Sequence, residues 1–303
     1  MSHHNGAILG CLAVSIIRKS PALIFTDLDG SLLDHDSYSF APAEPLLNNL
    51  ETEYIPVIPT TSKTFAEVEK LRVKLNNRHP FIIENGAAIA IPSNYFPSMP
   101  KECYEKSGFW IVANSRPRNH WNNLLEKNCQ EFDGEFETFS SIYTAKGAKG
   151  IQEITGLSLD QAELSNQRDF SEPIHWLGSE QRKQEFIAKL TAAGGTLLQG
   201  GRFLALGGKV DKGRALLQLT KLYQQFNLLA EFHTLAIGDS GNDISMLEAA
   251  TSAIIIRSKT HAAPSLSRDS NLIKSDAFGP EGWAESVSFW LSNSLEIGSK
   301  NYG

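Results

Sequence analysis

Two aspartates separated by one residue are the first side chains in this sequence whose types and spacing suit chemistry. Asp27 and Asp29 follow the short apolar run 22–25 and precede Gly30. Side chains two positions apart in an extended chain point to the same side, so both carboxylates can reach one substrate. One of them can attack as a nucleophile while the other exchanges a proton with the leaving oxygen. A turn or a capping role is the alternative for the pair taken alone.

A second acidic group follows another apolar run. The segment 238–243 reads G-D-S-G-N-D and comes directly after the apolar residues 235–237. Its carboxylates, Asp239 and Asp243, would repel the first pair at the same sheet edge unless a cation joined them. Hard oxygen ligands of this kind suit Mg²⁺. A glycine-rich turn in which Asp243 caps a helix is the alternative.

Two single residues have the chemistry of phosphate binding. Thr61 follows a strand expected at 54–58 and offers a hydroxyl at a helix N-terminus, where backbone N–H groups also favour anions. Lys212 can hold a phosphoryl group as a point charge and steady a nucleophile. An ordinary helix cap and a solvated surface lysine are the alternatives for these two residues.

The alternation of apolar runs with helical patterns predicts the frame that holds these residues. Short apolar runs bounded by turns are typical of strands buried on both faces of a parallel sheet. Strands are expected at 22–25, 54–58, 81–83, 233–237 and 253–256, and helices at 42–53, 64–75, 212–226, 243–250 and 282–293. We therefore predict an α/β fold with a doubly wound, Rossmann-like parallel sheet, whose ligands bind at the carboxyl ends of its strands.

The middle of the chain breaks this alternation. Residues 91–145 are richer in Pro, Asn, Ser and aromatic side chains and show weaker periodicity. Helices are expected at 146–156 and 179–193, and short strands at 173–177, 196–199 and 202–206. We predict a core domain split over 21–90 and 207–303, an inserted α+β cap domain over 91–206, and an N-terminal extension over 1–20.

Composition limits the partners of the chain. Its 303 residues include 34 acidic and 28 basic side chains, and the net charge of −6 argues against nucleic-acid binding. Three widely spaced cysteines without C-x-x-C predict reduced thiols in a cytoplasmic protein; they are Cys11, Cys103 and Cys129. No stretch approaches the ~20 apolar residues of a membrane span. We expect no nucleic-acid or membrane partner, and either a monomer or a homodimer.

In order and spacing, these residues resemble the haloacid dehalogenase superfamily of phosphatases. The large insertion between Thr61 and Lys212 resembles the cap of its Cof-type branch. The resemblance implies a phosphoric monoester hydrolase in which Asp27 becomes phosphorylated and Asp29 acts as general acid and then as general base. It implies that Thr61 and Lys212 bind the transferring phosphoryl group. Mg²⁺ is the implied cofactor, and its implied ligands are Asp27, the backbone carbonyl of Asp29, and Asp239, with Asp243 in support.

Shorter segments resemble those of mannosyl-3-phosphoglycerate phosphatases, which release mannosylglycerate or related glycosylglycerates. These segments are T-S-K-T at 61–64, E-N-G at 84–86, R-D-F-S-E-P at 168–173, G-G-R-F at 200–203 and G-P-E-G-W at 279–283. The resemblance implies a phosphorylated glycosylglycerate as substrate. The substrate-binding residues that we expect from it are Ser62, Lys63, Glu84, Asn85, Arg168, Ser171, Glu172, Gly201, Arg202 and Asn242.

Such a substrate carries a phosphate, a carboxylate and several hydroxyls. Arg168 and Arg202 can fork onto the carboxylate or the phosphate, because guanidinium geometry matches both. Ser171 and Glu172 can hydrogen-bond sugar hydroxyls, and Lys63 adds positive charge near the phosphate. An exposed ion pair or a strand-edge charge is the alternative for the arginines and for Glu172. Both a mannosyl and a glucosyl group fit this description.

Three other functions share some of these features. A Cof-type phosphatase acting on hexose, sucrose or trehalose phosphate uses the same chemistry on another substrate. A phospho-accepting signalling receiver also combines acidic residues, a threonine and a lysine on a doubly wound sheet, but it is much shorter and has no inserted cap. A serine hydrolase is suggested by G-D-S-G at 238–241, but Asn242 follows it instead of glycine and no histidine lies in a recognisable motif.

Overall fold

A parallel sheet forms the centre of the computed structural model, which describes residues 21–200, 202–227 and 231–297. Its five strands lie in the order β13-β12-β11-β1-β2. They are β1 (Ala22–Thr26), β2 (Val57–Pro59), β11 (His233–Gly238), β12 (Ser252–Arg257) and β13 (Leu272–Phe278). Because β1 pairs in parallel with β11, segments from opposite ends of the chain lie side by side. The predicted α/β fold with a parallel sheet is confirmed.

Alternating apolar side chains bury both faces of this sheet. Ile24 of β1 belongs to a hydrophobic cluster that includes residues of α1 (Glu44–Thr52), α2 (Phe65–Lys74) and α9 (Gly279–Ile297). Its neighbour Leu23 belongs to a second cluster, with residues of α7 (Lys212–Asn227) and α8 (Ile244–Ala249). Successive strand residues point to opposite faces, which explains why the strands read as continuous apolar runs.

A second sheet extends the core. Its order is β3-β4-β6-β5, and its pairs are antiparallel. An isolated parallel bridge between Thr60 and Ile82 joins this sheet to the end of β2. The strands are β3 (Phe81–Ile83), β4 (Ala88–Pro92), β5 (Tyr104–Lys106) and β6 (Phe109–Ala113).

The expected start of the cap at residue 91 is wrong. Strand β6 pairs with β4 along its length, and Phe109 and Ile111 share a hydrophobic cluster with Ile24 of the central sheet. Because this stretch is aromatic and polar in composition, it carries no strand signal for the β5-β6 hairpin, which belongs to the core. We propose that the inserted domain covers residues 114–207.

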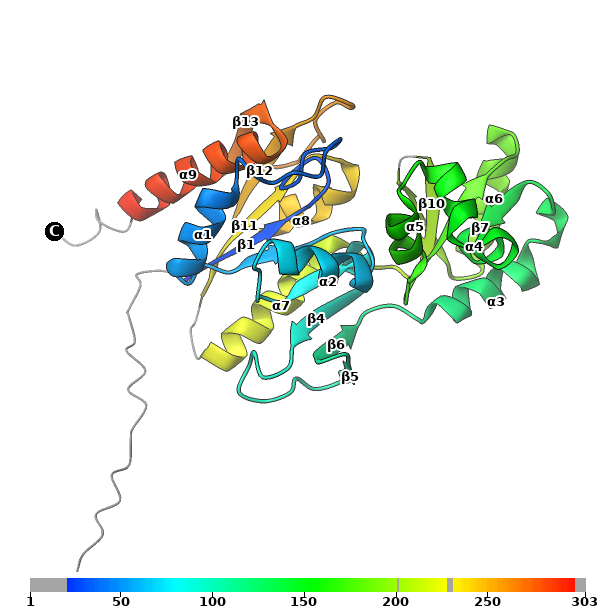
Figure 1. Ribbon diagram of the computed structural model, residues 1–303, viewed down its shortest axis with the longest axis horizontal. Helices are drawn as coiled ribbons and strands as arrows, with labels where there is room; N and C mark the ends of the chain where they lie inside the picture. Colours follow the sequence, from blue (N-terminus) through cyan, green and yellow to red (C-terminus); the bar gives the residue numbers. More distant parts are fainter. Residues whose placement is uncertain (1–20, 201, 228–230, 298–303) are drawn as a thin grey trace, which may run out of the picture.

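The cap has a sheet of its own (Figure 1). It also has a hydrophobic cluster of its own. Its antiparallel sheet runs β7-β8-β10-β9, from β7 (Phe136–Thr138), β8 (Glu172–Trp176), β9 (Thr196–Gly200) and β10 (Phe203–Gly207). Its helices are α3 (Arg118–Asn128), α4 (Phe139–Thr155), α5 (Leu159–Asn166) and α6 (Glu180–Ala192). Short 3₁₀ turns lie at Glu84–Gly86, Gln130–Phe132 and Gly241–Asp243.

Several elements of the structure differ from the sequence-based expectations. The strand expected at 54–58 begins only at Val57, because Tyr54 has φ = 55° and its side chain is exposed. Helix α4 begins at Phe139 instead of residue 146, and Thr138 caps it by accepting a hydrogen bond from the Ser141 N–H. Strand β13 is at the edge of the sheet and carries three consecutive polar residues, Lys274 to Asp276, between two apolar pairs, so it has no continuous apolar run. No helix within the described ranges is both long enough and apolar enough to cross a membrane.

Trp283 connects the last helix to the strand that carries the first aspartate. Its indole is fully buried in the cluster around β1. The indole Nε1–H donates a 3.0 Å hydrogen bond to Thr26 Oγ1, and the Thr26 hydroxyl donates to the backbone carbonyl of Asp27. The G-P-E-G-W segment therefore supports the carboxyl end of β1.

Replacement of Trp283 by alanine is expected to lower the free energy of unfolding by about 3–5 kcal/mol, because it leaves a large cavity and removes the bond to Thr26. Phe289 lies on the same helix with 60% of its surface exposed and serves as the matched control. Phe289→Ala is expected to change stability by less than about 0.5 kcal/mol. Urea unfolding followed by circular dichroism measures both values, and equal losses would contradict this role of Trp283.

Candidate active site

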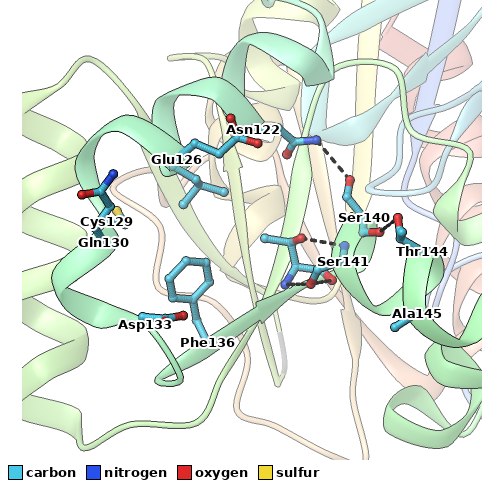
Figure 2. A pocket seen from close by; sticks show the side chains of 12 residues that line it. Asn122, Glu126, Cys129, Gln130, Asp133, Phe136, Ser140, Ser141, Thr144 and Ala145 are labelled. Carbon is cyan, nitrogen blue, oxygen red and sulfur yellow. Dashed lines mark hydrogen bonds between the residues drawn. The ribbon is translucent and has the colours of Figure 1, made fainter.

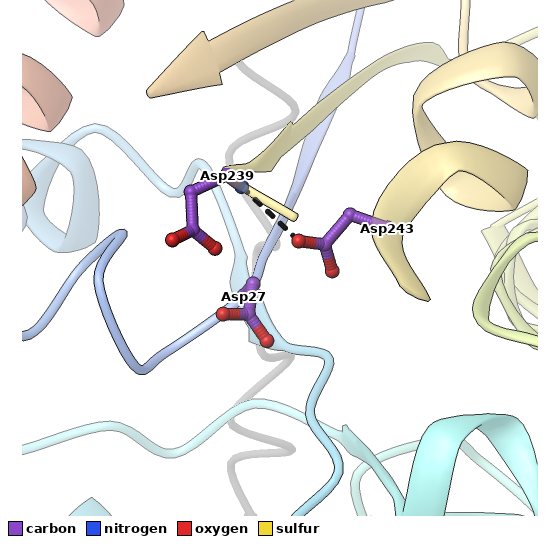
Figure 3. Close-up of side chains that lie close together, drawn as sticks. All are labelled: Asp27, Asp239 and Asp243. Atoms are coloured by element: carbon purple, nitrogen blue, oxygen red, sulfur yellow. Dashed lines mark hydrogen bonds between the residues drawn. The ribbon is translucent and has the colours of Figure 1, made fainter. Parts of the chain in front are cut away.

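The predicted catalytic segments meet at the carboxyl edge of the parallel sheet. Asp27 directly follows β1, and Asp239 directly follows β11, its neighbour in the sheet. Lys212 is the first residue of α7, and Thr61 comes two residues after β2. Figure 3 shows Asp27, Asp239 and Asp243 turned toward one another. The structure thus brings together side chains that lie up to about two hundred residues apart, as ligand sites in open α/β sheets do.

Lys212 lies between two of these carboxylates. Its Nζ is 2.6 Å from Asp27 Oδ1 and 2.6 Å from Asp243 Oδ1, and its side chain is fully buried. Burial alone lowers the pKa of Lys212, but the adjacent Asp243 and Asp27 raise it above its usual value. The lysine therefore stays charged, and its ion pair with Asp27 orients the carboxylate of that residue. The surface-lysine alternative is wrong.

Asp243 has little capacity left for a metal ion. Its Oδ1 accepts from Lys212, and its Oδ2 accepts from the backbone N–H groups of Asp239 at 3.1 Å and Ser240 at 3.0 Å. These bonds close the loop after β11 and aim the Asp239 side chain. We infer that Asp243 supports the metal site through Asp239 and Lys212.

Asp27, Asp239 and Asp243 form a group whose ligand atoms all lie within 4.8 Å of one another. Burial and the neighbouring Asp243 raise the pKa of Asp239 to about 6, and burial raises the pKa of Asp27 well above its usual range. Such crowding of carboxylates is what a divalent cation relieves, and oxygen ligands are those that Mg²⁺ prefers. The residues present therefore fit a magnesium ion.

Gly30 leaves the room that this site needs. A Cβ atom at this position would lie 2.6 Å from Asp239 Oδ2, and the residue has φ = 80°. Both the close approach and the left-handed backbone require glycine. The D-x-D-G segment thus ends in glycine because Asp239, in the loop after β11, leaves no space for a larger side chain.

Asp29 has a different cationic partner from that of Asp27. Its Oδ2 is 2.7 Å from Lys63 Nζ, while its Oδ1 is buried without a hydrogen-bond partner among the described residues. Burial lowers the pKa of Lys63, but Asp29 and Glu67 raise it above its usual value. Lys63, expected to bind substrate, therefore contacts the proposed general acid/base directly, and the free Oδ1 can serve proton transfer.

Thr61 is held in place by its backbone. Its N–H donates to the carbonyl of Ile82, and its carbonyl accepts from the N–H of Asn85. Its Oγ1 accepts from the N–H of Lys63 at 3.2 Å, so its hydroxyl proton remains available for a phosphate oxygen. Thr64, three residues later, is the residue that caps helix α2. The capping alternative for Thr61 is therefore wrong.

Four of the expected substrate-binding residues contact one another across the boundary between core and cap. The buried carboxylate of Glu84 accepts hydrogen bonds from the Ser171 hydroxyl and from two cap N–H groups. Arg168 donates to the carbonyl of Ser62 at 3.3 Å and to Ser171 Oγ at 3.1 Å. These residues are therefore held together by contacts within the protein itself.

Two of the expected residues connect the core loops to each other. Asn242 Nδ2 donates to Asn85 Oδ1 at 3.1 Å, which joins the loop after β11 to the turn after β3. Asn85 also lines a narrow cleft of about 20 Å³ between the core and the cap. Ser171, Thr196, Leu198 and Ala205 line the cap side of this cleft. Thr196 was not expected, because a single threonine in a short strand carries no sequence signal.

The structure does not bring the remaining cap residues into this cleft. Glu172 is fully buried, and its carboxylate accepts four hydrogen bonds, from Arg118 Nε and Nη2 and from the N–H and hydroxyl of Ser140. The expectation that it binds a sugar hydroxyl is wrong, because all its acceptor positions are occupied. Arg202 is exposed and donates to the carbonyl of Thr155 at 2.8 Å. Gly201 lies outside the described residues.

A larger cavity lies elsewhere in the cap. Its volume is about 640 Å³. Figure 2 shows the side chains of α3 and α4 that line it. Its lining includes Phe136, Glu126 and the buried thiol Cys129, whose pKa is raised to about 11 by burial. None of the residues expected to act in the reaction lines it.

His261 is a neighbour of the acidic group that sequence reasoning missed. Its Nε2 lies 3.2 Å from Asp239 Oδ2, on the loop that follows β12. The sequence around it matches no motif, so only the fold reveals this contact. It offers a hydrogen-bond partner that orients the carboxylate of Asp239.

Asp239→Asn is expected to stabilise the metal-free protein by about 1–3 kcal/mol near pH 7.5, because it removes a carboxylate that is costly to ionise in the fold. The pKa of about 6 lies above the ordinary aspartate value, so wild type gains stability as the pH falls below about 6. The advantage of the variant should therefore shrink toward pH 4. Thermal unfolding at both pH values tests this, and isothermal titration calorimetry should show that the variant no longer binds Mg²⁺. A less stable variant at neutral pH would contradict the charge crowding.

The chain matches the family of haloacid dehalogenase-like hydrolases over residues 24–100 and 164–268. Two curated relatives are each described as a glucosyl-3-phosphoglycerate/mannosyl-3-phosphoglycerate phosphatase. The relative from Methanococcoides burtonii is 33% identical over 270 residues, which cover 88% of this chain and 95% of the relative. The relative from Persephonella marina is 34% identical over 278 residues, covering 91% and 99%.

Solved structures share the fold at lower identity. A Thermoplasma acidophilum protein has a TM-score of 0.61 and 17% identity, covering 90% of this chain and 99% of its own. The sucrose-phosphatase from Synechocystis, solved with sucrose and phosphate, has a TM-score of 0.55 and 16% identity, covering 89% and 98%. The family match includes all four catalytic segments and spans most of the chain, and the curated relatives match nearly end to end. The chain therefore belongs to the haloacid dehalogenase-like hydrolases.

Proposed function

We propose that this hydrolase is a Mg²⁺-dependent phosphatase that converts a glycosyl-3-phosphoglycerate into glycosylglycerate and phosphate. The observation that carries the proposal is the pair of aspartates after β1 with separate partners, Asp27 on Lys212 and Asp29 on Lys63. One carboxylate is fixed beside a buried cation, and the other has a free oxygen for proton transfer. This division suits a nucleophile and a general acid/base acting on one phosphate ester.

The reaction has two steps. In the first, an Asp27 carboxylate oxygen attacks phosphorus, the ester P–O bond breaks, and Asp29 gives its proton to the departing glycerate oxygen. In the second, Asp29 takes a proton from water, whose oxygen attacks the aspartyl-phosphate, so that phosphate leaves and the Asp27 carboxylate is restored. Each step passes one proton through Asp29, and no redox partner is needed.

Two residues stabilise the charge on the transferring phosphoryl group. The Thr61 hydroxyl and the Lys212 ammonium both lie at the sheet edge, and Lys212 offsets part of the negative charge of Asp27 that would repel an incoming anion. Asp27, Asp239 and the Asp29 carbonyl would hold Mg²⁺, which would supply further positive charge to offset the phosphate. The net charge of −6 is therefore no obstacle to an anionic substrate.

The glycosylglycerate part of the substrate would occupy the cleft between core and cap. The two curated relatives carry this activity in their descriptions and are similar over most of the chain. Arg168 also supports the choice, because its Nε is buried without a partner among the described residues and can donate to the glycerate carboxylate. A sugar-phosphate phosphatase is the second candidate, and the sucrose-phosphatase likeness supports it only at the level of fold.

The proposal includes a reducing compartment such as the cytoplasm. Cys103 and Cys129 are free thiols, which is the state that such a compartment maintains.

Mannosyl- and glucosyl-3-phosphoglycerate are expected to be hydrolysed with a kcat/KM at least about 100-fold above that of hexose, sucrose or trehalose phosphate, since only the former carry a carboxylate for Arg168. Phosphate release by purified protein with Mg²⁺ measures each value. A preference for the simple sugar phosphates would assign the chain to the second candidate. Accumulation of a stable aspartyl-phosphate without turnover would instead indicate a signalling protein.

Asp27→Asn is expected to lower phosphate release by at least about 10³-fold, because the amide cannot form the covalent intermediate. Removal of divalent cations with a chelator should have a similar effect on wild type, reversed by added Mg²⁺. The exposed Asp276 offers a matched control, and Asp276→Asn should retain full activity. Near-normal activity of the Asp27 variant, with its fold confirmed by circular dichroism, would exclude this mechanism.

A further inference from the structure

The expected substrate-binding residue Glu84 has a different task in this structure. Building on the proposed function, we propose that Glu84 is a positioning residue that fastens the cap over the cleft and does not itself bind the substrate. Through this attachment it places the cap residue Arg168 where the carboxylate of the substrate arrives. Glu84 and its neighbours make three sets of contacts that support this role, on the cap, in the core and at Arg168.

Cap residues surround the Glu84 carboxylate with hydrogen-bond donors. Oε1 accepts from the Asp169 N–H at 2.8 Å, and Oε2 accepts from the Phe170 N–H at 3.2 Å and from the Ser171 hydroxyl at 2.5 Å. Arg168 Nη1 lies 3.8 Å from the same Oε2. The residue is only 3% exposed. With these donors in place, little acceptor capacity is left for a sugar hydroxyl.

The core side of Glu84 is fixed to the catalytic loops. Glu84 and Asn85 both have positive φ, 47° and 59°, which is costly for residues other than glycine and persists only where the surroundings enforce it. Here the Glu84 N–H donates to the carbonyl of Lys63, and the Asn85 N–H donates to the carbonyl of Thr61. The turn therefore moves with the loop that carries Thr61 and Lys63.

Gly86 completes this attachment. A Cβ atom there would lie 2.2 Å from the carbonyl oxygen of Asp211, so the turn packs directly against the residue before Lys212. Asn85 contacts Asn242 in the loop after β11. The E-N-G turn thus touches three of the loops that carry catalytic residues, and its first side chain reaches the cap.

Arg168 is the cap residue that this attachment positions for the substrate. Its Nη1 and Nη2 donate to the carbonyl of Ser62 in the core, and Nη1 also donates to Ser171 Oγ. Its Nε is buried without a partner among the described residues, although a guanidinium normally uses all its donors when buried. An incoming carboxylate would satisfy this N–H. Glu84 therefore holds Arg168 in the orientation that leaves one donor for the substrate.

Kinetics on two substrates separates positioning from a structural role. Glu84→Gln keeps the shape and one acceptor oxygen, whereas Glu84→Ala removes both oxygens. For glycosyl-3-phosphoglycerate we expect kcat/KM to fall about 10-fold in the first variant and about 100-fold or more in the second, mostly through KM. For p-nitrophenyl phosphate, which has no carboxylate for the cap to hold, both variants should stay within about 3-fold of wild type. Equal losses on both substrates would make Glu84 a structural residue and overturn the proposal.

Asp160 provides the matched control. It is an exposed carboxylate on the cap helix α5, 3.8 Å from Lys70 on the core helix α2, and so it also links cap to core but lies away from the turn. Asp160→Asn should leave both substrates unaffected. An effect as large as that of Glu84→Gln would show that any contact between cap and core matters, and would contradict a specific role for Glu84.

Hydrogen exchange tests the attachment without any activity. The N–H groups of Asp169 and Phe170 should exchange at least about 10-fold faster in the Glu84→Gln variant than in wild type, while strand β1 keeps its protection. This measurement stays decisive if wild type hydrolyses p-nitrophenyl phosphate but not glycosyl-3-phosphoglycerate, a result that would refute the proposed substrate alone. Unchanged exchange at both N–H groups would refute the attachment whatever the substrate.

Discussion

A buried ammonium between two carboxylates is the interaction on which the rest of this site depends. Lys212 contacts Asp27 and Asp243 at equal distance and has no exposed surface. Removing such a charge from water is costly unless its partners surround it, so the lysine and both aspartates must be placed together. This requirement joins the end of β1, the start of α7 and the loop after β11. The surplus of negative charge that remains, on Asp27 and Asp239, is what prepares the edge for a divalent cation.

The turn after β3 extends this arrangement to the cap. Its residues contact the loops of Thr61, of Asp211 and of Asn242, and Glu84 reaches the cap segment around Asp169. The cap otherwise has its own sheet and its own hydrophobic cluster, although Phe170 of the cap also belongs to the cluster of the core. A fold of this kind separates the phosphate chemistry, which belongs to the core, from the choice of leaving group, which belongs to the cleft beneath the cap.

Much of the core could be predicted because its signals are local. Buried parallel strands read as apolar runs, and the D-x-D-G and G-D-S-G-N-D segments follow two of them directly. The hairpin β5-β6 was assigned to the wrong domain, because pairing between distant strands leaves no periodic trace in composition. The cap residues were predicted least well. Glu172 reads like a ligand for a sugar hydroxyl, but Arg118, more than fifty positions away, occupies it.

The sequence by itself determined the parallel sheet, the four segments proposed to be catalytic and their order along the chain, since each rests on residue types at short spacing. Only the tertiary structure decided which carboxylate pairs with which cation. Lys212 contacts Asp27, whereas Lys63 contacts Asp29, and Asp243 is occupied by backbone N–H groups. It also decided that Glu84, although it lines the cleft, has its carboxylate oxygens hydrogen-bonded to donors of the cap. The reason is physical: buried charges and hydrogen-bond acceptors take the partners that the fold brings near, and those partners come from distant parts of the chain.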